Sequence, residues 1–394
     1  MILLEYPTVH LRPGADKRVR AGHLWVFSNE LEDGFQNLSP GEPVQLADWR
    51  GQVIGTGTIN PHSLIAVRIF TRRAESLGRE LLGRRLDAAI ALRQRLFPPS
   101  EEAYRVVFSE SDGLPGLIVD RFRDVIVLQS TTAGMDRLLP EVVPLLIERF
   151  SPRTVIAAND APVRELEGLQ LMREVVEGAL DGPVEFVQDE IHFLSDPLAG
   201  QKTGFFLDQR FNRRLLVTLL PRESRVLDLF SYSGGFGGYA LKAGAAHVTF
   251  VDSSQHALDL ARQTTSLNRW SEHAEFVKAD VFDYLKKEPQ LFDAVLLDPP
   301  ALAKSRAKLA AAERAYRDLN ARAMERVRPG GLLATSSCSG LVSLPAWREA
   351  LRLASVKSGR RLRILAQGGQ APDHPILSAM PETEYLKFAI GVVD

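Results

Sequence analysis

The chain has 394 residues, 45% of them hydrophobic, and its formal net charge is −1. This length allows two or three domains with cores of their own, and the charge balance excludes a protein that binds nucleic acid simply as a polycation. The one cysteine excludes a disulfide framework and a cysteine-rich zinc site, and no two of the eight histidines have the helical spacing of a metal site, so no metal is predicted.

The sequence also gives no sign of export or of a membrane span. Residues 1–10 lack the basic flank and the apolar stretch of a signal peptide, and no apolar run approaches the ~18 residues of a membrane-spanning helix. We therefore expect a cytoplasmic protein with no membrane partner.

The first predicted domain, residues 1–73, is small and mostly β. Short runs of apolar residues are separated by turn residues such as Pro13, Gly14, Pro40 and Gly41. The predicted strands are 8–11, 25–27, 43–48, 53–59 and 65–70.

The second predicted domain, residues 74–182, is a linker helix followed by a small α+β domain. Leucines at helical spacing, with arginines between them, predict an amphipathic helix over 75–96 that ends at Pro98. Glu110 and Asp112 lie in a later turn-like run, where capping of the turn is favoured over contact with a substrate. The predicted strands are 103–107, 117–122, 125–129 and 154–158, with a helix near 135–149.

The third predicted domain, residues 183–394, has an α/β pattern. A hairpin-like stretch at 186–194 precedes a series of apolar runs that end on small or polar residues, as buried parallel strands do. The predicted strands are 225–230, 247–251, 274–277, 292–297, 332–336, 362–366 and 384–392.

The turn after the strand at 225–230 is the predicted centre of a ligand site. Ser231, Ser233 and Gly234 form a run of small residues that opens a helix predicted at 236–242. Glycine lets the backbone approach a ligand closely, and the first N–H groups of the helix are donors for it.

Polar residues follow these strands one after another. Asp228 lies in the first strand, and Asp252 ends the second 24 residues later, close to the spacing at which a doubly wound sheet binds an adenosine ribose. Asp280, with an aromatic residue close by, follows the third strand, where it could hydrogen-bond an adenine. Asp298 and Cys338 follow the fourth and fifth strands. All five are expected at one ligand-binding edge, and a nucleoside-containing cofactor is the first inference.

A second predicted ligand segment is 201–210, where a tight turn at Gly204 precedes a helix. Lys202 and Arg210 supply the positive charge that the carboxylate of a cofactor requires. The alternative is a capped helix with an internal ion pair that involves Asp208.

The layout of residues 201–338 resembles the class I S-adenosylmethionine-dependent methyltransferases. The resemblance implies a Rossmann-like, seven-stranded sheet in which 362–366 and 384–392 form the last hairpin. It also implies S-adenosyl-L-methionine as the cofactor.

Cys338 lies among polar, flexible residues, which favours a nucleophile over an inert core thiol. Carbon 5 of a pyrimidine becomes nucleophilic only after a thiolate adds to carbon 6, so this cysteine permits methylation of carbon. Asp298, if burial keeps it protonated, would hydrogen-bond N3, and it could also bind the exocyclic amine of cytosine. Lys304 and Lys308 are candidate sources of the positive charge that favours a thiolate.

Residues 12–18, 22–28 and 55–61 look like parts of the PUA domain, an RNA-binding fold. The whole chain resembles the RlmI-type ribosomal RNA methyltransferases, which join a PUA domain, a small central domain and a Rossmann-like catalytic domain. The likeness is strongest at 201–210, 228–237, 298–305 and 337–339. It implies formation of 5-methylcytosine in 23S ribosomal RNA, free or in an assembling large subunit, with Cys338 as the nucleophile and Asp298 beside it.

The strand ends and the resemblance together give the expected cofactor-binding residues. These are Lys202, Thr203, Phe206, Asp208, Arg210, Asp228, Phe230, Ser231, Tyr232, Ser233, Gly234, Asp252, Ser253, Asp280, Asp298 and Pro299. Among them, Phe230 and Tyr232 depart from the generic pattern, because many methyltransferases have glycine there. Arg306, Lys308 and Arg314 are expected at the RNA-binding rim, where phosphate contacts would offset the cost of unstacking a base, on the order of a few kcal/mol.

Several interpretations stay open at this point. Pro300 and Ala301 stand where many RNA cytosine methyltransferases carry a second cysteine, so the group that removes the carbon-5 proton is not assigned. His23 and Trp25 are as consistent with packing as with RNA contact. The alternative functions are a guanine-N methyltransferase, which needs no thiol, a uracil-5 methyltransferase, and a non-catalytic RNA-binding ribosome assembly factor. A homodimer is one alternative for the oligomeric state.

Overall fold

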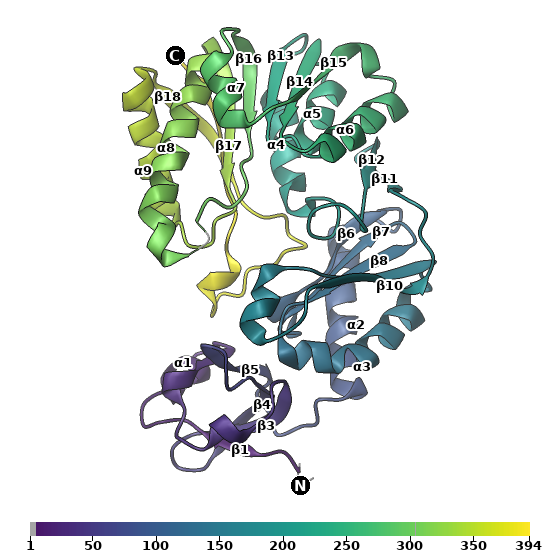
Figure 1. Cartoon of the computed structure of the whole chain (residues 1–394), viewed down its shortest axis with the longest axis vertical. Coiled ribbons are helices and arrows are strands. Elements are labelled where there is room, and N and C mark those ends of the chain that lie inside the picture. The colour runs from purple at the N-terminus through teal and green to yellow at the C-terminus, as the bar shows by residue number, and fades with distance from the viewer. Residues whose placement is uncertain (1–4, 304) are drawn as a thin grey trace. The chain divides into compact units, whose positions relative to one another are not determined.

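The computed structural model describes residues 5–303 and 305–394, which form two compact units (Figure 1). Unit 1 contains the chain up to Val184 together with Asp196–Gly204 and Pro372–Thr383. Unit 2 contains Glu185–Ser195, Phe205–Ala371 and Glu384–Asp394. Two loops from the predicted third domain therefore pack within unit 1. In the described parts of the chain, no helix combines the length and the apolar character that a membrane crossing requires.

The first sheet of unit 1 has five strands in the order β1-β3-β4-β5-β2. They are β1 (Thr8–His10), β2 (Trp25–Phe27), β3 (Glu42–Ala47), β4 (Val53–Ile59) and β5 (Ile65–Thr71). All five predicted strands are confirmed, with small shifts at their ends. Val26, Leu46 and Val67 lie in their common core. The short helix α1 (Asp16–Arg20) was not predicted, because its single buried residue, Val19, gives no helical pattern.

The second sheet of unit 1 also has five strands, in the order β10-β9-β8-β7-β6. They are β6 (Ala103–Phe108), β7 (Leu117–Phe122), β8 (Val125–Ser130), β9 (Thr154–Asn159) and β10 (Met172–Gly178), and the helices α2 (Arg79–Leu96) and α3 (Ala133–Phe150) pack against them. Leu86 of α2 and Leu146 of α3 meet Val119 of β7 in this core. Strand β10 was missed because its residues are mostly exposed and show no buried apolar run.

Unit 2 is built on a seven-stranded sheet in the order β15-β14-β13-β16-β17-β19-β18. The strands are β13 (Arg225–Leu229), β14 (His247–Asp252), β15 (Ala274–Lys278), β16 (Phe292–Leu297), β17 (Val327–Ser337), β18 (Leu362–Gly368) and β19 (Lys387–Val393). Strands β13 to β17 pair with one another in parallel, whereas β19 is antiparallel to both β17 and β18. The predicted seven-stranded sheet with its final hairpin is therefore confirmed. The predicted hairpin near 186–194 is also present, as β11 (Val184–Gln188) and β12 (Ile191–Ser195).

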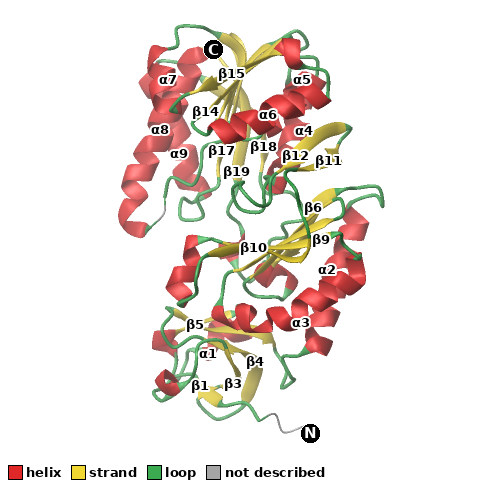
Figure 2. Ribbon diagram, turned by 45° about the vertical axis from the view of Figure 1, so that its right-hand side comes forward, coloured by secondary structure: helices red, strands yellow, loops and turns green. Residues whose placement is uncertain are grey.

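Helices cover both faces of this sheet (Figure 2). Val226 of β13 packs with α4 (Arg210–Leu219), α5 (Gly235–Lys242) and α6 (Gln255–Leu267) on one face. On the other face, Leu227 of the same strand packs with α7 (Val281–Lys287), α8 (Leu309–Arg326) and α9 (Leu344–Ser358). Successive residues of a strand point to opposite faces, so a strand buried on both sides reads as a continuous apolar run.

Candidate functional site

The turn that joins β13 to α5 holds two bulky residues in the left-handed backbone conformation. Phe230 has φ +58° and Tyr232 has φ +46°, and Gly234 follows with φ +83°. This conformation costs a side-chain-bearing residue on the order of 1–2 kcal/mol, so surrounding contacts must hold it. The ring of Tyr232 lies edge-on to Phe206 with centroids 5.2 Å apart, and that of Phe230 lies edge-on to Phe282 at 6.5 Å. The two aromatic residues thus hold a backbone shape that glycine adopts most readily.

Asp228, in β13, accepts a hydrogen bond from the helix that follows this turn. Its Oδ2 accepts the main-chain N–H of Gly237 at 2.8 Å, in the first turn of α5. A Cβ on Gly237 would lie 2.1 Å from the ring of Phe250, so only glycine lets the helix approach the sheet this closely. Burial raises the pKa of Asp228 to about 8.

Asp252 is held at the end of β14 by two main-chain donors. Its Oδ2 accepts the N–H of Tyr232 at 2.9 Å, and its Oδ1 accepts the N–H of Ser254 at 2.8 Å. The carboxylate is thereby fixed beside the turn at 230–234, which we call the cofactor turn. The exposed Ser253 follows it in the chain. Asp280 is exposed and caps α7 by accepting the N–H of Asp283 at 3.1 Å, so it has a structural task as well as the proposed contact with adenine.

Asp298 follows β16 and faces two donors. The side-chain amide of Gln209 donates to its Oδ1 at 2.8 Å, and the hydroxyl of Ser336 donates to the same oxygen. Burial raises the pKa of Asp298 to about 6, although both hydrogen bonds act in the opposite direction. The next residue, Pro299, is buried, and its carbonyl oxygen lies 3.8 Å from Sγ of Cys338. Cys338 therefore lies against the main chain of the residue that follows Asp298.

Cys338 is half-buried at the end of β17, in a loop held by two neighbours. The hydroxyls of Tyr316 and Ser339 are 2.8 Å apart. Nζ of Lys387 donates to the carbonyl oxygens of Ser339, at 2.7 Å, and of Tyr385, at 2.8 Å. Burial lowers the pKa of Lys387 to about 8, and its coulombic interaction with Cys338 opposes that shift.

Lys387 was missed at the sequence level, where Lys304 and Lys308 were the expected cations. Lys308 is exposed, and Lys304 lies outside the described residues. Lys387 stands opposite Ser337 in the β17–β19 pairing, so only knowledge of that register would have placed it beside the thiol. The available signal was a single lysine at the start of an otherwise apolar strand.

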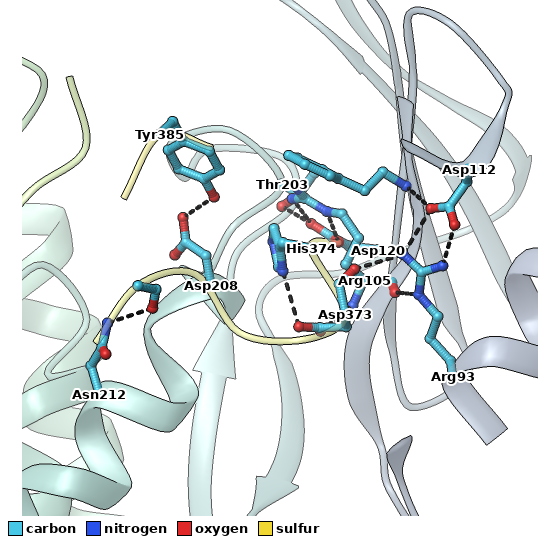
Figure 3. Close-up of polar contacts among 12 residues, drawn as sticks. Arg93, Arg105, Asp112, Asp120, Thr203, Asp208, Asn212, Asp373, His374 and Tyr385 are labelled. Carbon is cyan, nitrogen blue, oxygen red and sulfur yellow. Dashed lines mark hydrogen bonds and ion pairs between the residues drawn. The ribbon is translucent and has the colours of Figure 1, made fainter. Parts of the chain in front are cut away.

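The segment 201–210 is divided between the two units. In unit 1, Thr203 donates from its hydroxyl to Asp120 at 2.5 Å (Figure 3). The carbonyl oxygen of Lys202 accepts from Arg173 at 2.8 Å. In unit 2, Asp208 accepts the hydroxyl of Tyr385 at 2.6 Å (Figure 3).

Arg210 is buried at the start of α4. When the Gln188 side-chain amide is oriented with its oxygen toward Arg210, that oxygen accepts from Nη2 of Arg210 at 2.6 Å and from Nε at 2.9 Å. Arg210 as the cation for a cofactor carboxylate therefore stays a prediction.

Acidic residues of the central domain have structural partners within unit 1. Asp112 accepts the N–H of Phe108 at 2.6 Å, which confirms the predicted capping of the turn, and it also pairs with Arg93 (Figure 3). Glu110 accepts from the indole of Trp25 at 2.8 Å and from Arg68 at 2.9 Å. These contacts favour the packing role for Trp25. His23 is also buried, with 4% of its surface exposed.

Two matches place the chain among known proteins. Residues 9–72 match a PUA-like domain, and residues 174–347 match an S-adenosylmethionine-dependent methyltransferase. The chain is 37% identical, over 385 residues, to the ribosomal RNA large subunit methyltransferase I of Alteromonas mediterranea. The alignment covers 96% of this chain and 97% of that protein. The chain belongs to this family. The protein of the same name from Photobacterium profundum is 39% identical over 391 residues, with 96% of this chain and 98% of that protein covered.

Solved structures show the same fold. A putative methyltransferase from Streptococcus mutans has a TM-score of 0.84 at 18% identity and covers 98% of this chain and 100% of its own. A putative methyltransferase complexed with SAH also has a TM-score of 0.84, at 20% identity, with 99% and 100% covered. S-adenosylmethionine is therefore the cofactor of this large subunit methyltransferase I family member, which confirms that prediction.

The cofactor turn fits this ligand chemically. The side-chain oxygens of Ser231 and Ser233 are buried, and within the described residues neither has a hydrogen-bond partner. Buried hydroxyls are normally satisfied, so these two are candidates to bind the cofactor. In the same described residues, no three His, Cys, Asp or Glu side chains are arranged to hold a metal ion.

Replacing Asp298 by asparagine should change how stability depends on pH. The asparagine oxygen can accept both hydrogen bonds, but it does not titrate. In the wild type, burial raises the carboxyl pKa from 3.8 to about 6, so the folded chain holds a proton that the unfolded chain releases, and stability falls as pH rises through this window. We expect the free energy of unfolding of Asp298→Asn, relative to the wild type, to increase by about 2 kcal/mol between about pH 4 and pH 7.

Urea unfolding at a series of pH values measures this difference. Asp33→Asn, at an exposed position, controls for the substitution itself. A constant difference between Asp298→Asn and the wild type across the window would contradict the raised pKa.

Proposed function

We propose that this chain methylates carbon 5 of a cytosine in 23S ribosomal RNA. The relatives are named as methyltransferases of large-subunit ribosomal RNA, and the cofactor supplies an electrophilic methyl group. The observation that carries the proposal is the position of Cys338. The chain's one cysteine is half-buried, and its sulfur lies 3.8 Å from the carbonyl oxygen of Pro299, the residue after Asp298. Methylation of a ring or exocyclic nitrogen needs no thiol at this place.

The proposed chemistry begins when the Cys338 thiolate adds to carbon 6 of the base. The electron pair of the 5,6 double bond moves into the ring, and carbon 5 becomes nucleophilic enough to take up a methyl group. The proton on carbon 5 then leaves, the carbon–sulfur bond breaks, and the thiolate and the aromatic ring are restored. Each half of the reaction passes through the covalent adduct on Cys338.

Asp298 is proposed to hold the base and balance the charge that addition creates. With its pKa raised to about 6, a fraction of this carboxyl is protonated near neutral pH and donates to N3. Gln209 and Ser336 both occupy Oδ1, so Oδ2 is the atom proposed to face the base.

Lys387 is proposed to favour the thiolate form of Cys338. A cation close to a thiol lowers the free energy of its charged form, and the buried Lys387 ammonium is held in place by two carbonyl oxygens. Its side chain cannot swing away into water without leaving those carbonyl oxygens unpaired.

RNA binding is proposed to involve the PUA-like domain and a rim on unit 2. Arg306, Lys308 and Arg314 are all exposed, on the segment that runs from Asp298 toward Tyr316. Phosphate contacts from such residues can offset the cost of turning a base out of its stack. A ribosomal substrate would also place the protein in the cytoplasm.

Cys338→Ala should abolish methylation while leaving cofactor binding intact. The thiolate is the only group proposed to activate carbon 5, so we expect loss of more than about a thousandfold in rate. Nucleoside mass spectrometry of ribosomal RNA, from cells carrying the wild type or the variant, identifies the methylated base and its loss. Methylated guanine that survives the substitution would contradict the proposal, and 5-methyluracil would redirect it to the other pyrimidine.

Lys387→Met should raise the pKa of the Cys338 thiol, because it removes a positive charge that interacts with it. Since Cys338 is the only cysteine, the pH dependence of iodoacetamide alkylation reports on it alone. Lys387→Arg keeps the charge and should restore the wild-type profile. If Met and Arg variants have the same profile, the electrostatic role is excluded.

Reversing the charge of Arg306, Lys308 and Arg314 should weaken RNA binding and make it less sensitive to salt. Each lost phosphate contact reduces the slope of log affinity against log salt concentration by roughly 0.7 to 0.9. Filter binding at several salt concentrations gives the slope. The matched control reverses Lys357, Arg361 and Arg363, which lie near the opposite edge of the sheet and should have little effect.

A further inference from the structure

Arg213, on α4, is buried and only partly satisfied. It is 3% exposed, and within the described residues its Nε and Nη1 have no hydrogen-bond partner. A buried guanidinium that lacks acceptors loses the hydrogen bonds it makes with water, at a cost of several kcal/mol unless another group replaces them. Such groups in a folded protein call for an explanation, and a ligand is one.

Aromatic rings and the start of α5 fix the position of the Arg213 guanidinium. Its central carbon lies 4.7 Å from the centre of the Phe205 ring and 5.5 Å from that of Phe236. A Cβ on Gly235 would come within 2.6 Å of Nη2, so the guanidinium rests against the backbone where the cofactor turn enters α5. The missing side chain of Gly235 is what makes room for it.

The start of α5 and the Arg213 guanidinium are the two positive features at this position. The N-terminal end of a helix carries partial positive charge, and Arg213 adds a full charge beside it. Asp208, Asp228 and Asp298 lie close enough to interact with Arg213 coulombically, but each has a hydrogen-bond donor of its own. They balance the charge of the guanidinium without occupying its Nε and Nη1.

We propose that Arg213 binds the carboxylate of the methionine part of S-adenosylmethionine. That carboxylate is the only anionic group of the cofactor, and it needs a cation or several N–H donors in a buried site. Arg210, one helical turn earlier, directs Nη2 and Nε at the side-chain oxygen of Gln188, whereas in the described residues nothing accepts from Nε and Nη1 of Arg213. The proposal depends on the identity of the cofactor and is independent of which base is methylated.

Two nucleosides that differ by one group test this assignment. S-adenosylhomocysteine carries the carboxylate, whereas its decarboxylated analogue keeps the adenosine, the thioether and the amine but has no carboxylate. Titration calorimetry on the full chain measures both. In Arg213→Gln we expect the affinity for S-adenosylhomocysteine to fall about 10- to 100-fold, the range measured for hydrogen bonds to charged groups, and the affinity for the analogue to change less than about threefold.

Arg214→Gln is the matched control, because the neighbouring arginine pairs with Asp189 and should affect neither ligand. Arg213→Lys keeps the charge with fewer donors, and it provides a second folded variant if glutamine destabilises the core. In Arg213→Lys, an intermediate loss of affinity that is confined to S-adenosylhomocysteine would support the assignment. Equal loss of both ligands in the folded variants, or loss of neither, would overturn it.

Discussion

The site depends on the burial of carboxyl groups at the C-terminal edge of a parallel sheet. Asp228 and Asp298 are removed from water, which raises the pKa of each, and they are tolerated because donors have been placed around them. The N–H of Gly237 serves Asp228, and the side chains of Gln209 and Ser336 serve Asp298. An acid held in this way can be neutral or charged near physiological pH, which suits both cofactor binding and base recognition.

The same constraint explains why positive charge is buried nearby. Arg213 lies among the carboxyls, and Lys387 lies at the loop that carries Cys338. Packing holds Arg213, and carbonyl oxygens hold Lys387, and neither forms a direct ion pair with any residue that the structure describes. The antiparallel strand β19 is essential to this arrangement, since its pairing with β17 places Lys387 opposite Ser337.

The fold was largely predictable because its strands are buried on both faces. Runs such as 225–230 and 292–297 read as continuous apolar segments, and the small or acidic residues after them mark the ligand edge. The placement of Asp298 and Cys338 at the ends of neighbouring strands followed from the same logic. Exposed elements such as β10 and the short α1 lack this pattern and were missed.

Side-chain partners could not be predicted in the same way, because they depend on register and packing. Arg210 and Arg213 are one turn apart on one helix, and only the structure shows that the first meets Gln188 and the second meets the cofactor turn. The position of Lys387 depends on its pairing with Ser337, which lies 50 residues earlier in the sequence. The left-handed conformation of Phe230 and Tyr232 could not be predicted either, because aromatic residues rarely adopt it.

The central claim is that Cys338 forms a covalent bond to the base, and one measurement tests it directly. In RNA that contains 5-fluorocytidine, carbon 5 can be methylated but cannot lose a proton, so the adduct at carbon 6 should persist. Incubation with S-adenosylmethionine, followed by mass spectrometry of peptides, should then find the nucleotide attached to the peptide that contains Cys338. Methylation of normal RNA without any such adduct from the fluorinated RNA would contradict the account.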